Sequence, residues 1–108
     1  MSDRSRDAKT LTIMMTEVVG STGLWRSHGD RDADDILRSQ ATIVYDQVTA
    51  FGGRVRKSMG DGFLISFPST VAAVRAAVAI QRALHEHNVA DPQRAVEARI
   101  GIHTGQVA

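Results

Sequence analysis

The sequence is 108 residues long, with 43% hydrophobic and 23% charged residues and a formal net charge of +1. These values are typical of one small folded domain, and they give no bulk electrostatic argument for a nucleic-acid or membrane-surface partner. The sequence contains no cysteine, which excludes disulfides and thiolate chemistry and fits a reducing, cytoplasmic location. Because the start lacks the apolar core of a signal peptide and no apolar run approaches the roughly 20 residues that span a bilayer, we expect a soluble domain without membrane insertion.

The first half of the chain predicts a strand followed by two helices. Residues 1–9 are charged and polar and predict a flexible tail or linker, and residues 10–108 predict the folded domain. Residues 11–16 predict a buried strand because apolar side chains occupy both of its faces. Ser21 or Thr22 is the expected cap of a short helix, and a longer helix runs from Asp30 to about Phe51, where two glycines end it. Its apolar stripe comprises Ile36, Leu37, Ile43, Val44, Val48 and Phe51.

The second half predicts a hairpin, a helix and a last strand. Strands at 55–58 and 63–67 flank the Gly-Asp-Gly sequence at 60–62, which is a hairpin signature. A helix is expected from 68–69 to about 87, then a loop at 88–94 and an alternating strand at 96–103. This helix is expected to run through Val71, Val74, Val78, Ile80 and Leu84.

The resulting order β-α-α-β-β-α-β predicts an α+β, ferredoxin-like fold, with a four-stranded antiparallel sheet and helices packed on one face. Right-handed crossovers make the first two strands run the same way, so the end of the first strand and the turn at 60–62 lie at one end of the sheet. If the third strand neighbours the first, Glu17 and Asp61 are close together.

Two carboxylates that converge beside glycine-rich backbone favour divalent cations that carry a phosphate. The backbone N–H groups of residues 19–23, at a helix start, favour the phosphate itself. Each feature also has a simpler interpretation: Asp61 as a turn residue, Glu17 as a solvated strand end, and residues 19–23 as an ordinary connection.

Lys57 lies on a strand whose alternation places it on one face with Val55 and Met59, and Arg54 and Arg56 on the other. A lysine among apolar neighbours is explained either by snorkelling or by contact with a ligand.

Three segments in this order resemble the catalytic domain of class III nucleotidyl (adenylate/guanylate) cyclases, particularly the bacterial type. They are MTEVVGST at 15–22, GGRVRKSMGDGF at 52–63 and RIGIHTG at 99–105. The resemblance covers essentially residues 10–108 and implies the N-terminal portion of such a domain, a truncated form. It implies a lyase that binds ATP and converts it to cyclic AMP and pyrophosphate with two Mg²⁺ or Mn²⁺ ions, in cyclic AMP biosynthesis and intracellular signal transduction.

The resemblance also implies a role for individual residues. The carboxylates of Glu17 and Asp61 and the backbone carbonyl of Val18 would hold the two ions, and no other catalytic residue falls within the chain. The β- and γ-phosphates would be received by Val19, Gly20, Ser21 and Thr22. Lys57 falls on the purine-reading lysine typical of adenylate rather than guanylate cyclases. Family active sites form between two head-to-tail subunits, which implies a homodimer or a partner cyclase domain.

Two departures from the family pattern bear on activity. Position 17 is glutamate where the family has aspartate, and the sequence stops before the second purine-reading residue and the asparagine and arginine that stabilise the transition state. Gln106 stands where an arginine is often found. We therefore expect residues 1–108 alone to have little or no cyclase activity, and to self-associate through exposed apolar surface.

The alternative is a non-catalytic cyclase-like module that binds nucleotide or dimerises to regulate a partner. A diguanylate cyclase is not supported, because no Gly-Gly-(Asp/Glu)-Glu-Phe turn occurs at the hairpin.

Overall fold

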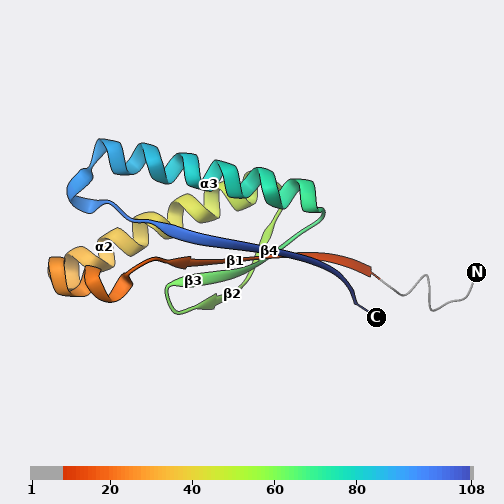
Figure 1. The fold of residues 1–108 in the computed structure, drawn as a ribbon, viewed down its shortest axis with the longest axis horizontal. Coiled ribbons are helices and arrows are strands. Elements are labelled where there is room, and N and C mark those ends of the chain that lie inside the picture. The colour runs from red at the N-terminus through yellow and green to blue at the C-terminus, as the bar shows by residue number, and fades with distance from the viewer. Residues whose placement is uncertain (1–8, 108) are drawn as a thin grey trace, which may run out of the picture.

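The structure is a computed structural model that describes residues 9–107 (Figure 1). In chain order its elements are β1 (Lys9–Val18), α2 (Ser21–Ala50), β2 (Arg54–Met59), β3 (Gly62–Phe67), α3 (Thr70–Ala90), the 3₁₀ helix η1 (Pro92–Arg94) and β4 (Ala98–Val107). Of the tail expected at 1–9, residues 1–8 lie outside the described residues, and Lys9 is the first residue of β1.

The four strands form one antiparallel sheet in the order β2-β3-β1-β4. The helices α2 and α3 cover one face of this sheet (Figure 1). This confirms the predicted α+β, ferredoxin-like arrangement. Because β3 runs antiparallel to both β1 and β2, those two strands run the same way. The C-terminal end of β1 and the β2–β3 turn therefore lie at the same end of the sheet, as Figure 1 shows.

Alternate residues of β1 separate the core from an open face of the sheet. Thr12, Met14, Thr16 and Val18 are buried under the helices, whereas Leu11 and Met15 are 39% and 48% exposed. The expectation that this strand is buried on both faces is therefore wrong, since both helices pack on the same side. We call the uncovered side the open face. From register and alternation it carries Leu11, Ile13, Met15, Glu17, Leu64, Ser66, Arg99, Gly101 and His103.

The core lies between the sheet and the two helices. Met14, Ile65, Val44 and Ile80, one from each of β1, β3, α2 and α3, have no exposed surface. Each such side chain stabilises the fold by about 1.5–3 kcal/mol relative to an exposed position. The apolar stripe predicted on α2 belongs to this core or packs against it, so that prediction is confirmed.

The beginning of α2 differs from the prediction at its cap. Gly20, with φ of 70°, is the N-cap residue, and no side chain caps the helix, so neither Ser21 nor Thr22 has the expected capping position. A non-helical residue, Gly29 with φ of 77°, interrupts α2. It divides the helix at the point where the sequence predicts the boundary between a short and a longer helix.

The end of α2 is a Schellman motif that directs the chain into β2. The N–H of Gly53 donates to the carbonyl of Val48 at 2.8 Å, and the N–H of Gly52 donates to the carbonyl of Thr49 at 3.1 Å. Gly52 has φ of 77°, which an L side chain rarely adopts. A Cβ on Gly53 would lie 2.6 Å from the ring of Phe67, so the absence of a side chain at Gly53 leaves room for that ring. Both glycines therefore have structural roles, as helix stops.

The helix α3 has apolar residues on two faces, of which one is buried. Ile80 and Leu84 are buried, together with Ala73 and Ala76. The valines at 71, 74 and 78 are 59%, 47% and 45% exposed. The buried face of α3 therefore combines two alanines with Ile80 and Leu84, and these three valines lie on the outer side.

The connection to β4 also differs from the prediction. The helix α3 continues to Ala90, beyond the expected end near residue 87, and η1 occupies the rest of the expected loop. The strand begins at Ala98 rather than at 96 and extends to Val107. Val96 is held by Asn88, whose side chain donates to its carbonyl and accepts from its N–H, both at 2.9 Å.

The predicted alternation of β2 is wrong because of an irregularity at Arg56. Val55 pairs with Ile65 of β3, but the next paired residue is Lys57, opposite Leu64. This extra residue shifts the register, so Val55 faces the helices while Lys57 and Met59 lie on the open face. Arg56 is also on the open face, where its Nε donates to Ser66 Oγ at 2.6 Å. Lys57 and Arg56 therefore lie on the same side of the sheet, separate from Val55.

Candidate functional site

Glu17 and Asp61 lie at the same rim of the sheet because β1 and β3 approach each other very closely there. A Cβ built on Gly62 would lie 1.8 Å from the carbonyl oxygen of Thr16 and 3.0 Å from Cα of Glu17. Since Asp61 precedes Gly62 and consecutive Cα atoms are about 3.8 Å apart, the Cα atoms of Glu17 and Asp61 are within about 8 Å of each other. The structure thus brings together two acids that are far apart in the sequence.

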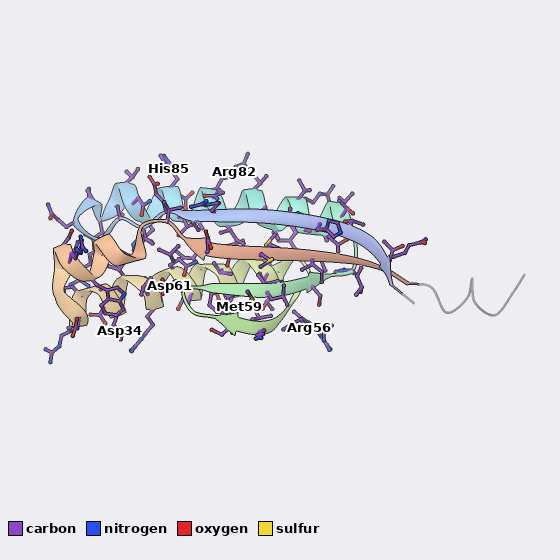
Figure 2. All side chains as sticks on the ribbon, turned by 60° about the horizontal axis from the view of Figure 1, so that its bottom comes forward. Asp34, Arg56, Met59, Asp61, Arg82 and His85 are labelled. Carbon is purple, nitrogen blue, oxygen red and sulfur yellow. The ribbon has the colours of Figure 1, made fainter. Side chains whose placement is uncertain are left out.

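The β2–β3 turn presents Asp61 at this rim, as Figure 2 shows for the labelled residue. Met59 pairs with Gly62, so Gly60 and Asp61 are the two residues of the turn. Gly60 has φ of 62°, the sign that a type II′ turn requires at its first central position. The two glycines therefore have different roles: Gly60 forms the turn, and Gly62 allows the contact with β1.

Glu17 is on the open face at the end of β1, opposite Arg99 of β4. Arg99 Nε lies 3.6 Å from Glu17 Oε1, and the two side chains are 70% and 63% exposed. Both residues border a shallow hollow of about 210 Å³ that is also lined by Met15, Met59 and Gly101. Sequence reasoning missed Arg99 because the pairing depends on the register of β1 with β4.

The donor atoms at this rim suit a hard divalent cation. Carboxylate and carbonyl oxygens are the ligands of Mg²⁺, which is commonly bound through one or two carboxylates plus substrate phosphates and water. Within residues 9–107, no cluster of three or more His, Cys, Asp or Glu side chains is arranged to hold a metal ion. An ion held by Glu17, Asp61 and the carbonyl of Val18 would therefore take its remaining ligands from a nucleotide and from water.

The segment after β1 leads directly from this rim into α2. The N–H of Val19 donates to the carbonyl of Glu97 at 2.9 Å, so that group is already used inside the protein. The first bond of the helix runs from the N–H of Leu24 to the carbonyl of Gly20 at 3.2 Å. The N–H groups of the first turn point out of a helix end without intrahelical partners, which favours an anion at Gly20–Thr22 rather than at Val19.

Lys57 is on the same open face but two strands away from Glu17. It pairs with Leu64, and Leu64 pairs with Met15 of β1. Adjacent strands are about 4.8 Å apart, so Lys57 lies about 10 Å to the side of β1. Within one chain the lysine is separated from the two acids.

A larger hollow lies elsewhere, between α3 and β4. It has a volume of about 770 Å³ and is lined by Val78, Arg82 and His85 of α3 and by Ile100 and Ile102 of β4. Figure 2 shows Arg82 and His85 along α3, away from Asp61 and Met59 at the hairpin. Neither Glu17 nor Asp61 lines this groove, whereas Arg99 borders both hollows.

Two residues of the matching segments have a structural explanation. The hydroxyl of Thr104 lies 3.0 Å from that of Thr12 and 2.8 Å from that of Thr70. This group of hydroxyls joins β1, β4 and the start of α3. Gly62 is required for the close approach of β1 and β3. Neither residue needs a ligand to account for its identity.

Comparison with known proteins places the chain in a family. The profile of the Adenylate and Guanylate cyclase catalytic domain matches residues 4–108, and the chain therefore belongs to this family. Members of the family bind a nucleotide substrate, generally use divalent metal ions and typically function as dimers. The recognition of a class III cyclase domain from the sequence is confirmed.

Similar proteins include both adenylyl and guanylyl cyclases. A receptor-type adenylate cyclase of Trypanosoma congolense is 30% identical over 78 residues, which is 72% of this chain and 10% of that protein. The guanylyl cyclase Cya2 is 28% identical with a TM-score of 0.79, covering 94% of this chain and 56% of that one. A bacterial light-regulated adenylyl cyclase has a TM-score of 0.83 at 21% identity, over 94% of this chain and 56% of that one, a likeness that shows the fold alone.

This chain covers only part of its relatives. It spans between 4% and 18% of the length of these curated proteins, and between 32% and 59% of these solved cyclase chains. Among residues 9–107, no helix is both long and apolar enough to cross a membrane.

Proposed function

We propose that this chain is the N-terminal portion of an adenylate cyclase catalytic domain and supplies the residues that hold metal ions and phosphate in the conversion of ATP to cyclic AMP. The main support is the contact of Gly62 with the end of β1, which brings Glu17 and Asp61 to one rim. Membership of the cyclase family supports the reaction class. A cytoplasmic location belongs to the same proposal, because ATP is the proposed substrate.

In the proposed reaction the 3′-oxygen of the ribose bonds to the α-phosphorus, and the bond from that phosphorus to the oxygen bridging to the β-phosphorus breaks. Pyrophosphate leaves, and the proton of the hydroxyl passes to solvent. Bound Mg²⁺ or Mn²⁺ would activate the hydroxyl and neutralise phosphate charge. Glu17, Asp61 and the Val18 carbonyl would hold these ions, and the first turn of α2 would hold the terminal phosphates.

Lys57 would read the purine ring in a second cyclase domain rather than in its own. Its position about 10 Å to the side of β1 supports this division, because it is separated from the acids of the same chain. A homodimer or a partner domain would then be needed for a complete site.

The reaction is tested with the full-length protein, ATP and Mn²⁺, by measuring cyclic AMP chromatographically. Asp61→Asn is expected to abolish formation of the product, whereas Asp46→Asn, which removes an exposed carboxylate of α2, is expected to leave it unchanged. Product formation by Asp61→Asn at the wild-type rate would contradict the proposal. Residues 1–108 alone are expected to form cyclic AMP only at the background rate. Turnover comparable to that of full-length cyclases would contradict the need for further segments of a cyclase domain.

The second candidate is a non-catalytic cyclase-like module, which the glutamate at position 17 favours. Its additional methylene displaces the carboxylate, and a displacement on the order of 1 Å costs about a hundredfold in rate. Glu17→Asp in the full-length protein distinguishes the two functions. A sharp rise in cyclic AMP formation supports a cyclase damped by this residue, and no change supports the binding or regulatory module.

A further inference from the structure

The ion pair between Glu17 and Arg99 gives the acid of β1 a partner other than a metal ion. The two residues are directly opposite in the β1–β4 register. Arg99 Nε is 3.6 Å from Glu17 Oε1. Opposed residues on neighbouring strands have Cβ atoms about 4.5–5.5 Å apart, so the length of a glutamate lets its carboxylate reach the guanidinium across this distance.

We propose that Arg99 is a positioning residue that holds the carboxylate of Glu17 when no divalent cation is bound and competes with that cation for it. This inference rests on the proposed function, because it concerns the same acid. The guanidinium of Arg99 and a divalent cation are both attracted to the negatively charged carboxylate oxygens of Glu17. Binding of the cation through Oε1, the oxygen that faces Arg99, therefore weakens the pair.

The exposure of the pair keeps this competition weak and reversible. The side chains of Arg99 and Glu17 are 70% and 63% exposed, so water screens their attraction. Exposed ion pairs shift an equilibrium by about twofold to fivefold. That is enough to lower the affinity for a cation and too little to block it.

The neighbourhood of the pair gives the side chains room to separate. Gly101, two residues along β4 on the same face, has no side chain, and a Cβ there would meet no atom within 4 Å. The hollow that this leaves is bordered by Met15 and Met59, whose side chains carry no charge. Among the residues lining it, Glu17 and Arg99 are the two charged ones.

The test measures Mn²⁺ binding to the full-length protein, without nucleotide, from the electron paramagnetic resonance signal of free Mn²⁺. Arg99→Gln is expected to lower the dissociation constant by about twofold to fivefold. Arg99→Lys, which keeps a positive charge, is expected to stay near the wild-type value. Arg56→Gln is the matched control, because it removes one arginine from the same face whose Nε is bonded to Ser66 rather than to Glu17.

The outcomes separate this inference from the proposed function. An unchanged or weaker affinity for Arg99→Gln, with Mn²⁺ binding that still depends on Asp61, would overturn the role of Arg99 alone. An equal gain in Mn²⁺ affinity in Arg56→Gln would also overturn the role of Arg99, since the gain would then reflect the change in net charge. Absence of any Asp61-dependent Mn²⁺ binding in the wild type would overturn both.

Discussion

Replacing Gly62 by alanine tests the contact that brings the two acids together. The added Cβ would lie 1.8 Å from the carbonyl oxygen of Thr16, and ordinary contact begins at 3.4 Å. The backbones of β1 and β3 must therefore move apart by about 1.6 Å at this point. Overpacking costs about 1–3 kcal/mol, and each weakened ladder hydrogen bond adds about 0.5–1.5 kcal/mol. We expect Gly62→Ala to lower the free energy of unfolding by about 2–4 kcal/mol.

Gly101→Ala is the matched control for this substitution. It also adds one methyl group to a strand glycine, but the new Cβ would have no atom within 4 Å. Because alanine loses less backbone entropy on folding than glycine, we expect a stability equal to the wild type or up to about 1 kcal/mol higher.

Urea unfolding followed by far-ultraviolet circular dichroism measures both variants, with the midpoint compared at unchanged slope. In thermal unfolding the Gly62 variant should melt more than about 10 °C lower than the wild type. Equal stability of the two alanine variants would refute the close approach of β1 and β3, and with it the argument that places Glu17 beside Asp61.

Four further substitutions test the packing of the core and of the α3–β4 connection by the same unfolding measurements. Ile80→Ala, on the buried face of α3, should cost about 2–5 kcal/mol, whereas Val78→Ala, at an exposed position, should cost less than about 1 kcal/mol; similar losses would contradict the assignment of faces. Asn88→Ala should cost about 1–3 kcal/mol, because it leaves the N–H and the carbonyl of the buried Val96 without their hydrogen-bond partner. An unchanged stability would argue against these two hydrogen bonds. Gln40→Met should be neutral or stabilising, since Gln40 is 1% exposed and its Nε2 has no partner, and a loss above about 1 kcal/mol would show that the amide is satisfied in solution.

The order and type of the main elements could be predicted from the sequence, because they depend on local residue patterns and on general rules of topology. Helical spacing identified the buried stripe of α2, and the glycines at 52 and 53 marked its end. Handedness and strand order then predicted that the end of β1 and the β2–β3 turn share one rim. The proximity of Glu17 and Asp61 depended in addition on β3 neighbouring β1, which the observed strand order shows.

The errors arose where a single residue or an inter-strand register decides the outcome. The extra residue at Arg56 puts Lys57 and Met59 on the face opposite to Val55, and strict alternation cannot anticipate it. The buried face of α3 combines Ala73 and Ala76 with Ile80 and Leu84 while three valines are exposed, and side-chain size alone does not indicate that division. The pairing of Glu17 with Arg99 depends on the register of two strands separated by most of the chain.

The central claim is that Glu17 and Asp61 hold the same divalent ions, and a double-mutant comparison of Mn²⁺ affinity in the full-length protein tests it most directly. We predict that Glu17→Gln and Asp61→Asn each raise the dissociation constant at least about tenfold, and that the double variant is little weaker than either one. A shared site would be contradicted if the dissociation constant of the double variant rose by the product of the two single-variant factors. Wild-type affinity for Mn²⁺ in either single variant would contradict it as well.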